Sequence, residues 1–198
     1  MKFSRREKKD LLNAGLLISL AFAILLVGGY RFLFSFNLSF IVVFLIAFFT
    51  AGIGFLLHEL MHKYVAQNYG LYAEFHAFYN MLLLALVFSL FGFIIAAPGA
   101  VFISGRITRE RNGKISLAGP LTNIILAGIF LTLLLFFSSE GLFGSFLNYG
   151  LMINALLAAF NMIHVMPFDG AKVLEWDKKV YFVTLALGVG LYLLSWMF

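Results

Sequence analysis

Long apolar runs separated by short polar connections constrain this sequence more than any other feature. A helix needs about 20 apolar residues to cross the hydrocarbon core of a bilayer. The pattern therefore predicts an all-α polytopic membrane protein with five to six transmembrane helices, and the lipid bilayer is its first expected partner. The runs that approach or exceed the required length cover residues 11–30, 38–64, 81–97, 115–137, 147–166 and 180–198.

The composition excludes the other broad classes. Hydrophobic residues make up 63% of the chain and charged residues 12%, whereas soluble globular proteins are about 45–50% apolar and about 25% charged. The absence of cysteine excludes disulfides and thiolate metal ligands. The net charge of +5 comes from short clusters between the apolar runs, as in juxtamembrane segments, and no basic stripe is interleaved with aromatic residues. We therefore expect no nucleic-acid partner.

The residues with the clearest chemistry lie near the end of the second run, which reads His58-Glu59-Leu60-Met61-His62. Two histidines four residues apart project from one face of a helix and can bind one Zn²⁺ together. Glu59 lies beside them, where a carboxylate can deprotonate water at the metal. Alternatively, these side chains line a proton path, since ionisable residues in membranes gather at functional cavities of several kinds.

A catalytic zinc site takes three protein ligands and leaves one position open. The candidates for the third ligand are His76, His164, Asp169 and a few loop carboxylates. Asp169 is favoured because Pro167 stops a helix and Gly170 permits a tight turn, so this segment can direct a carboxylate back into the bundle. We interpret His164 as a hydrogen-bonded interior histidine.

Two further motifs accompany the histidine pair. One reads Ala118-Gly119-Pro120-Leu121-Thr122-Asn123, and the other runs from Asn161 to Gly170. Together, the three motifs resemble the H-E-x-x-H, A-G-P-x-x-N and N-x-x-P-x-x-P-x-D-G-G elements of the site-2 protease family of intramembrane zinc metalloproteases. Two positions differ from that pattern, because His164 stands in place of a proline and Ala171 in place of the second glycine.

The resemblance implies one Zn²⁺ held by His58, His62 and Asp169, with Glu59 as the general base. It also implies hydrolysis of peptide bonds within or near transmembrane helices of membrane-anchored protein substrates, as in regulated intramembrane proteolysis. We expect one membrane-embedded domain over residues 1–198 with a catalytic core at about 38–175. The resemblance implies that this is a minimal form, and we expect no added peptide-binding or regulatory domain. The substrate, the trigger and the oligomeric state are not indicated.

Two alternatives belong to other functional classes. A catalytically silent homologue would act as a membrane binding partner, but such a protein has no need of a general base at Glu59. A small metal or proton transporter would need a file of polar residues across the membrane or repeated half-bundles, and the sequence shows neither.

Asn123 and Asn161 are amides within the predicted bundle. Such groups can hold the backbone of an unwound substrate helix or an oxyanion. Hydrogen bonding between helices explains them equally well.

The topology is predicted from the positions of the basic residues and from the alternating direction of successive membrane spans. Basic residues near the amino terminus place it in the cytoplasm, so the second span ends at the cytoplasmic face. At about 1.5 Å per residue, His62 and His58 then lie roughly 7 and 13 Å inside a boundary near Gln67. Asp169 reaches the same face only if residues 78–104 enter and return as a re-entrant hairpin or a pair of short helices. The carboxy terminus is then external, and every Lys and Arg except Arg31 is cytoplasmic.

Overall fold

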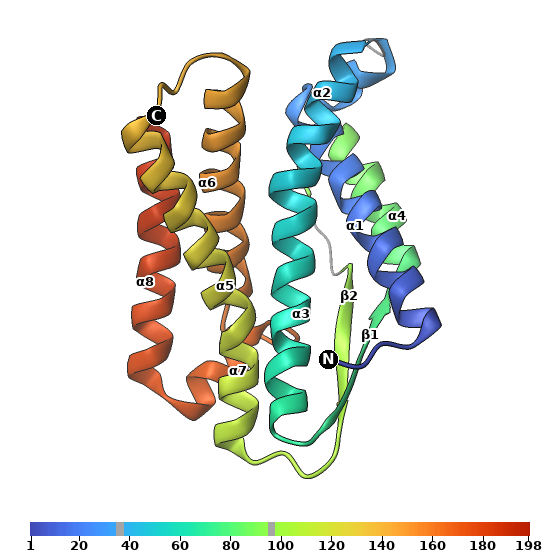
Figure 1. Cartoon of the computed structure of the whole chain (residues 1–198), viewed down its shortest axis with the longest axis vertical. Helices are drawn as coiled ribbons and strands as arrows, with labels where there is room; N and C mark the ends of the chain where they lie inside the picture. Colours follow the sequence, from blue (N-terminus) through green and yellow to red (C-terminus); the bar gives the residue numbers. More distant parts are fainter. Residues whose placement is uncertain (35–37, 95–97) are drawn as a thin grey trace. The chain divides into compact units, whose positions relative to one another are not determined.

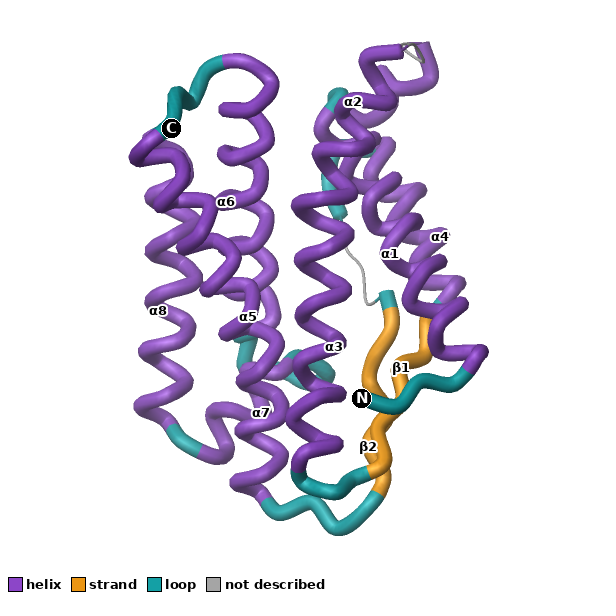
Figure 2. The backbone as a smooth tube through the Cα atoms, in the orientation of Figure 1, coloured by secondary structure: helices purple, strands orange, loops and turns teal. Residues whose placement is uncertain are grey.

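The computed structural model describes residues 1–34, 38–94 and 98–198, which are mainly helical (Figure 1). Two strands, β1 (Tyr72–Ala77) and β2 (Gly99–Ser104), pair as a small sheet (Figure 2). A π-helical turn, Phe48–Gly52, lies between α2 and α3. The α-helices are α1 (Arg5–Leu26), α2 (Leu38–Ala47), α3 (Ile53–Asn68), α4 (Tyr79–Leu90), α5 (Arg109–Phe136), α6 (Gly141–Asn161), α7 (Asp169–Trp176) and α8 (Lys178–Leu194).

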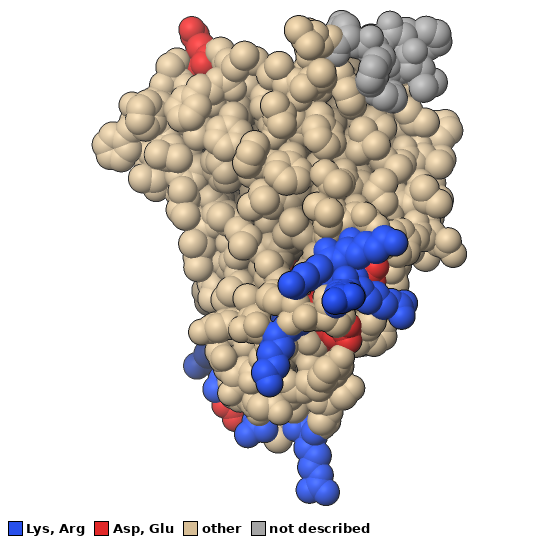
Figure 3. Space-filling view, turned by 45° about the vertical axis from the view of Figure 1, so that its right-hand side comes forward, with Lys and Arg blue, Asp and Glu red and all other residues tan. Residues whose placement is uncertain are grey.

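The helices confirm the predicted all-α polytopic membrane fold. Many of their large apolar side chains are exposed, including Phe182, Leu187 and Trp196 near the carboxy terminus. Charged side chains occupy only small areas of the face shown in Figure 3. Such a surface suits lipid and would be an aggregation hazard in water. Five segments among the described residues are long and apolar enough to cross a membrane: Arg5–Leu26, Leu38–Asn68, Arg109–Phe136, Gly141–Asn161 and Lys178–Met197.

Polar side chains set where several of these helices begin. The first backbone N–H groups of a helix have no partner within it, and a side-chain oxygen just before the helix can accept their hydrogen bonds. Thr108 does this for Arg111 N and so sets the start of α5, the helix that carries Gly119 and Asn123. Ser4 and Asp177 cap α1 and α8 in the same way.

Residues 57–73 and 103–198 form one compact unit. In this unit α5 packs along α6, α8 packs against both, and the short α7 packs against α5 and α8 (Figure 1). Small residues permit the close approach, as is usual between membrane helices. A Cβ added at Gly150 would collide with the ring of Phe130. The centre of the α5–α6 contact is apolar and contains Ala127, Leu134, Leu147, Leu151 and Ala155.

Residues 2–56 and 74–102 form a second compact unit, in which α1 packs against α2 and α4. Helix α4 has 12 residues. At about 1.5 Å per residue it is far shorter than the roughly 30 Å core of a bilayer. The segment also returns to its origin, because Phe78 N donates to Pro98 O at 3.0 Å. These features fit the hairpin predicted near residues 78–104, of which residues 95–97 lie outside the described residues, and its return to the same membrane face stays a prediction. The two strands that frame it are not anticipated by the sequence analysis.

The first turns of α1 separate their charges by face. Glu7 and Asp10 are buried, and their carboxylates accept hydrogen bonds from Phe75 N at 2.9 Å and Ala77 N at 3.3 Å. These side chains thus pair backbone groups of β1 that an edge strand would otherwise expose. The basic side chains of the same turns point outward as exposed groups: Arg5, Arg6, Lys8 and Lys9.

Candidate metal site

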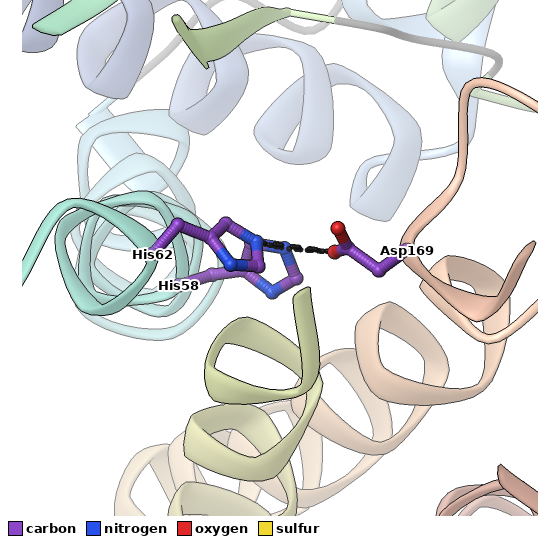
Figure 4. Close-up of side chains that lie close together, drawn as sticks. All are labelled: His58, His62 and Asp169. Atoms are coloured by element: carbon purple, nitrogen blue, oxygen red, sulfur yellow. Dashed lines mark hydrogen bonds and ion pairs between the residues drawn. The ribbon is translucent and has the colours of Figure 1, made fainter. Parts of the chain in front are cut away.

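Helix α3 carries both histidines of the candidate site, one turn apart and buried at 4% and 7% exposure for His58 and His62. Asp169, the first residue of α7, points toward them (Figure 4). Its Oδ2 lies 3.3 Å from His58 Nε2 and 3.1 Å from His62 Nε2, and the two Nε2 atoms are 3.0 Å apart. Three potential ligand atoms from two segments distant in sequence therefore face one point.

Close packing of the backbone brings Asp169 to this point. Helix α6 ends at Asn161, earlier than the predicted run, and the connection folds back onto the start of α7. A Cβ at Gly170 would collide with the carbonyl of Met162. The φ of Gly170 is not positive, so the backbone conformation does not require a glycine here. What requires it is the close approach to Met162. On α5, Gly113 leaves room for Trp176 of α7 in the same way.

The three ligand atoms fit a zinc ion. Tetrahedral zinc with ligands at about 2.0–2.1 Å requires its ligand atoms to lie about 3.3 Å apart. The observed separations of 3.0–3.3 Å are close to that value. Two histidines and one carboxylate also form a ligand set that is typical of catalytic zinc, with a fourth position open to water or substrate. His58, His62 and Asp169 are the group of this kind found among the described residues.

Hydrogen bonds at the far side of each imidazole prepare the ring for a metal. His58 Nδ1 donates to Asn123 Oδ1 at 2.7 Å, and His62 Nδ1 donates to Ile115 O at 2.7 Å. Because both acceptors are oxygens, each Nδ1 carries the proton and each Nε2 presents a lone pair to the centre. Two lone pairs and a carboxylate facing one another call for a cation between them.

Glu59 is also buried and lies beside His58 on α3. Its carboxylate interacts electrostatically with His58, Asp169 and Lys172. Lys172, on the next turn of α7, places its Nζ 3.9 Å from Asp169 Oδ1, the oxygen that does not face the histidines. Burial alone would raise the pKa of Asp169. When the histidines are protonated in the absence of a metal, the charge of His62 and hydrogen bonds from both rings instead hold this pKa well below its usual range. The carboxylate is therefore kept ionised as a ligand.

The two asparagines take different positions. Asn123 is fully buried, and it donates from Nδ2 to Asn154 Oδ1 at 3.0 Å while accepting from His58. Asn161 is partly buried and donates to Leu157 O within its own helix. Hydrogen bonding between helices thus describes Asn123, and the substrate or oxyanion role of both amides stays a prediction.

The other histidine candidates lie outside the group of ligand atoms. His164 is exposed in the connection between α6 and α7, so its interpretation as an interior histidine is wrong. The reason is that α6 ends before it, which leaves residues 163–167 as an exposed connection. His76 belongs to β1, where its ring packs edge-on against Phe102.

Comparison with known proteins agrees with this geometry. The chain is 41% identical over 199 residues to a protein of Methanocaldococcus jannaschii named "Putative zinc metalloprotease MJ0611", and the match covers 98% of each chain. The chain belongs to the site-2 protease family of zinc metalloproteases. Another protein of that organism, named "Zinc metalloprotease MJ0392", is 32% identical over 131 residues, which are 66% of this chain and 33% of that protein. No family model and no solved structure matches the chain.

Membership of this family and the ligand geometry together identify the ion as a single zinc. All three ligand residues were expected from the sequence. Two features near the site were not: the buried Asn154, and the approach of Lys172 to Asp169. Lys172 follows Asp169 by three residues, a spacing that places both on one face of a helix and was therefore an available signal.

Proposed function

We propose that this protein is an intramembrane endopeptidase that hydrolyses peptide bonds within or near transmembrane helices of membrane-anchored proteins. The observation that carries the proposal is the convergence of His58, His62 and Asp169 on one point beside the buried carboxylate of Glu59. The histidines belong to a segment, Leu38–Asn68, that is long enough to cross a membrane. A hydrolytic site built into such a helix meets substrates that are themselves embedded in lipid.

The chemistry follows from the positions of the side chains. His58, His62 and Asp169 would hold the metal. A zinc ion at such a site polarises the scissile carbonyl and lowers the pKa of water to about 7. Glu59 takes the proton from the attacking water and passes it to the amine nitrogen of the leaving peptide. Burial of all four side chains excludes bulk water from the ligands.

The substrate must lose its helical hydrogen bonds before it can be cut, because a transmembrane helix satisfies its own backbone groups. We infer that the partly buried amide of Asn161, at the end of α6, contributes to holding the unwound backbone or the oxyanion, whereas Asn123 is engaged by His58 and Asn154. The proposed catalytic core covers residues 38–175 within one membrane-embedded domain. Cleavage of membrane-anchored regulators, as in regulated intramembrane proteolysis, is the role that such an activity serves.

The proposed orientation places the amino terminus and the site near the cytoplasmic face. The hairpin between α3 and α5 supports this orientation, because its two ends are hydrogen-bonded to each other through Phe78 N and Pro98 O. In the proposed topology this segment does not cross the membrane, so α5 begins on the side where α3 ends. The exposed Arg109 and Arg111 at the start of α5 then lie on the same side as the basic start of α1.

The proposal is tested with purified protein in detergent and in liposomes. Bound zinc is counted by atomic absorption, and cleavage of a panel of single-span membrane proteins is followed by gel and mass spectrometry. Glu59→Gln is the decisive variant, because an amide cannot act as a base. We expect it to bind zinc fully and to lose at least about 10²-fold in rate. Glu175→Gln, which removes an exposed glutamate from α7, is the matched control.

Three outcomes decide between the candidate functions. Zinc binding with cleavage inside the membrane segment, lost in Glu59→Gln alone, supports the proposal. Undiminished cleavage by Glu59→Gln would overturn the assignment of the base. Zinc binding without cleavage of any substrate in the panel would count against the protease and in favour of a catalytically silent homologue.

A further inference from the structure

A chain of hydrogen bonds runs from the candidate metal ligand His58 to the backbone of α6. His58 Nδ1 donates to Asn123 Oδ1, and Asn123 Nδ2 donates to Asn154 Oδ1 at 3.0 Å. Asn154 Nδ2 in turn donates to Gly150 O at 2.9 Å. Both asparagines are fully buried. The chain thus links α3, α5 and α6 through the interior of one compact unit.

The far end of this chain fixes the direction of every hydrogen bond in it. A backbone carbonyl can only accept, so Asn154 must turn its NH₂ toward Gly150 O and its Oδ1 toward α5. Asn123 must then meet that oxygen with its own NH₂, which leaves its Oδ1 for His58. His58 consequently carries its proton on Nδ1.

Reversal of the Asn123 amide would have a specific chemical consequence. Its NH₂ group would face His58 Nδ1, which would then have to accept, and the imidazole proton would move to Nε2. A protonated Nε2 has no lone pair for a metal. An asparagine alone can adopt either orientation, because its oxygen and nitrogen have nearly the same shape.

We propose that Asn154 is a positioning residue for zinc binding, and that it acts through Asn123 to keep the Nε2 of His58 free for the metal. This inference rests on the proposed metal site. In this chain of hydrogen bonds Asn154 contacts Asn123 and not His58. It therefore acts indirectly, by determining which nitrogen of His58 carries the proton. A buried hydrogen-bond network of this kind is effective only when each member is satisfied in one direction.

The experiment first compares three single variants for zinc affinity and for the tautomer of His58. Asn154→Leu keeps the approximate volume and removes the acceptor that Asn123 needs. Asn154→Asp keeps an oxygen that accepts from Asn123 Nδ2. Thr184→Val is the matched control, because Thr184 is buried and donates to the carbonyl four residues earlier, as Asn154 does. Thr184 belongs to α8, which is not one of the helices that this hydrogen-bond chain links.

Two measurements are made on each protein in detergent. Zinc affinity is obtained by competition with a chromophoric chelator. The imidazole tautomer of His58 is read in the metal-free protein by ¹⁵N NMR, with a His58→Gln variant to assign the signal. Circular dichroism and thermal unfolding establish that each variant is folded.

We expect Asn154→Leu to lower zinc affinity by about 10-fold or more, within the 10–100-fold range usual for partners of metal ligands. Its metal-free His58 should show a population protonated at Nε2. Asn154→Asp should stay within about three-fold of the native affinity, and so should Thr184→Val. The double variant of Asn123→Ala with Asn154→Leu should bind zinc no more weakly than Asn123→Ala alone, because the two residues act in one chain.

Other results would overturn the inference. Native zinc affinity and an unchanged His58 tautomer in Asn154→Leu would show that Asn154 only joins helices. An equal loss of zinc affinity in Thr184→Val would also overturn the inference. So would a double variant whose loss of zinc affinity equals the sum of the losses, as free energies, in Asn123→Ala and Asn154→Leu. Failure of the proposed function can be told apart from failure of this inference. Native protein that does not bind zinc would refute the metal site, while the NMR measurement would still test whether Asn154 determines the tautomer of His58.

Discussion

Gly119 of α5 lies directly against His62 of α3. A Cβ added at position 119 would be 2.5 Å from His62 Nε2 and 2.6 Å from His58 Nε2. Real Cβ atoms do not approach other heavy atoms so closely, so the space beside the two ligand atoms exists because residue 119 has no side chain. The glycine of the A-G-P-x-x-N motif therefore clears the approach to the metal position.

Substitution of this glycine by alanine is expected to abolish tight zinc binding. The methyl group would push one imidazole away from the centre, and a displaced ligand costs at least about 10-fold in affinity. Gly128→Ala on the same helix is the control, because nothing lies within 4 Å of its added Cβ. There we expect native zinc affinity and unchanged or slightly higher thermal stability, since alanine favours helix over glycine by about 1 kcal/mol. Equal zinc affinity in both variants would contradict the packing relationship.

Removal of the carboxylate ligand should weaken the site without unfolding the helices. Asp169→Ala leaves a two-histidine site, so we expect zinc affinity to fall by at least about 100-fold, as measured by chelator competition. Glu175→Ala, on the exposed side of α7, should bind zinc normally. Full zinc occupancy in Asp169→Ala at low free zinc would mean that another residue supplies the third ligand.

Zinc affinity should depend on pH through the histidines. Protons and zinc compete for the two Nε2 atoms, so zinc binding releases protons. The pKa of Asp169 is lowered. Its carboxylate is therefore ionised and able to bind zinc at any pH above the ordinary pKa of an aspartate, and this ability is lost only as the pH falls through the lowered pKa. Between pH 5 and 8 Asp169 therefore stays ionised. As the pH falls through this range we expect zinc affinity to decrease by up to about 100-fold per pH unit, which is the limit reached when both imidazoles must lose a proton to bind the metal. A slope of about 10-fold per unit would indicate that only one histidine binds the metal.

Single cysteines can test the topology, since the native chain has none. Glu110 at the start of α5 and Glu140 before α6 are both exposed and lie at opposite ends of α5. We expect Glu110→Cys to react with an impermeant maleimide only from the cytoplasmic side, and Glu140→Cys only from the outside. Labelling of position 110 from outside would refute the proposed re-entrant path between α3 and α5.

Local pattern alone was enough to predict several parts of this protein. The membrane fold follows from the length of apolar runs, because lipid requires each crossing to satisfy its own backbone hydrogen bonds. The placement of His58 and His62 follows from helical periodicity, since residues four apart share a face. Asp169 was predicted from a proline and a glycine nearby, although the close approach of Gly170 to Met162 differs from the tight turn that was expected.

Other features depend on contacts between segments far apart in sequence, and only the tertiary structure decided them. β1 pairs with β2 across the hairpin between them, and Glu7 and Asp10 bind β1 from 68 and 67 positions away in the sequence. The link from His58 through Asn123 to Asn154 requires three helices to meet at one depth. Periodicity shows which face of a helix a side chain occupies, but the partner of that face is set by packing, where small residues let particular helices approach. The sequence therefore determined the ligands of the metal, and the packing of the helices decided how those ligands are held.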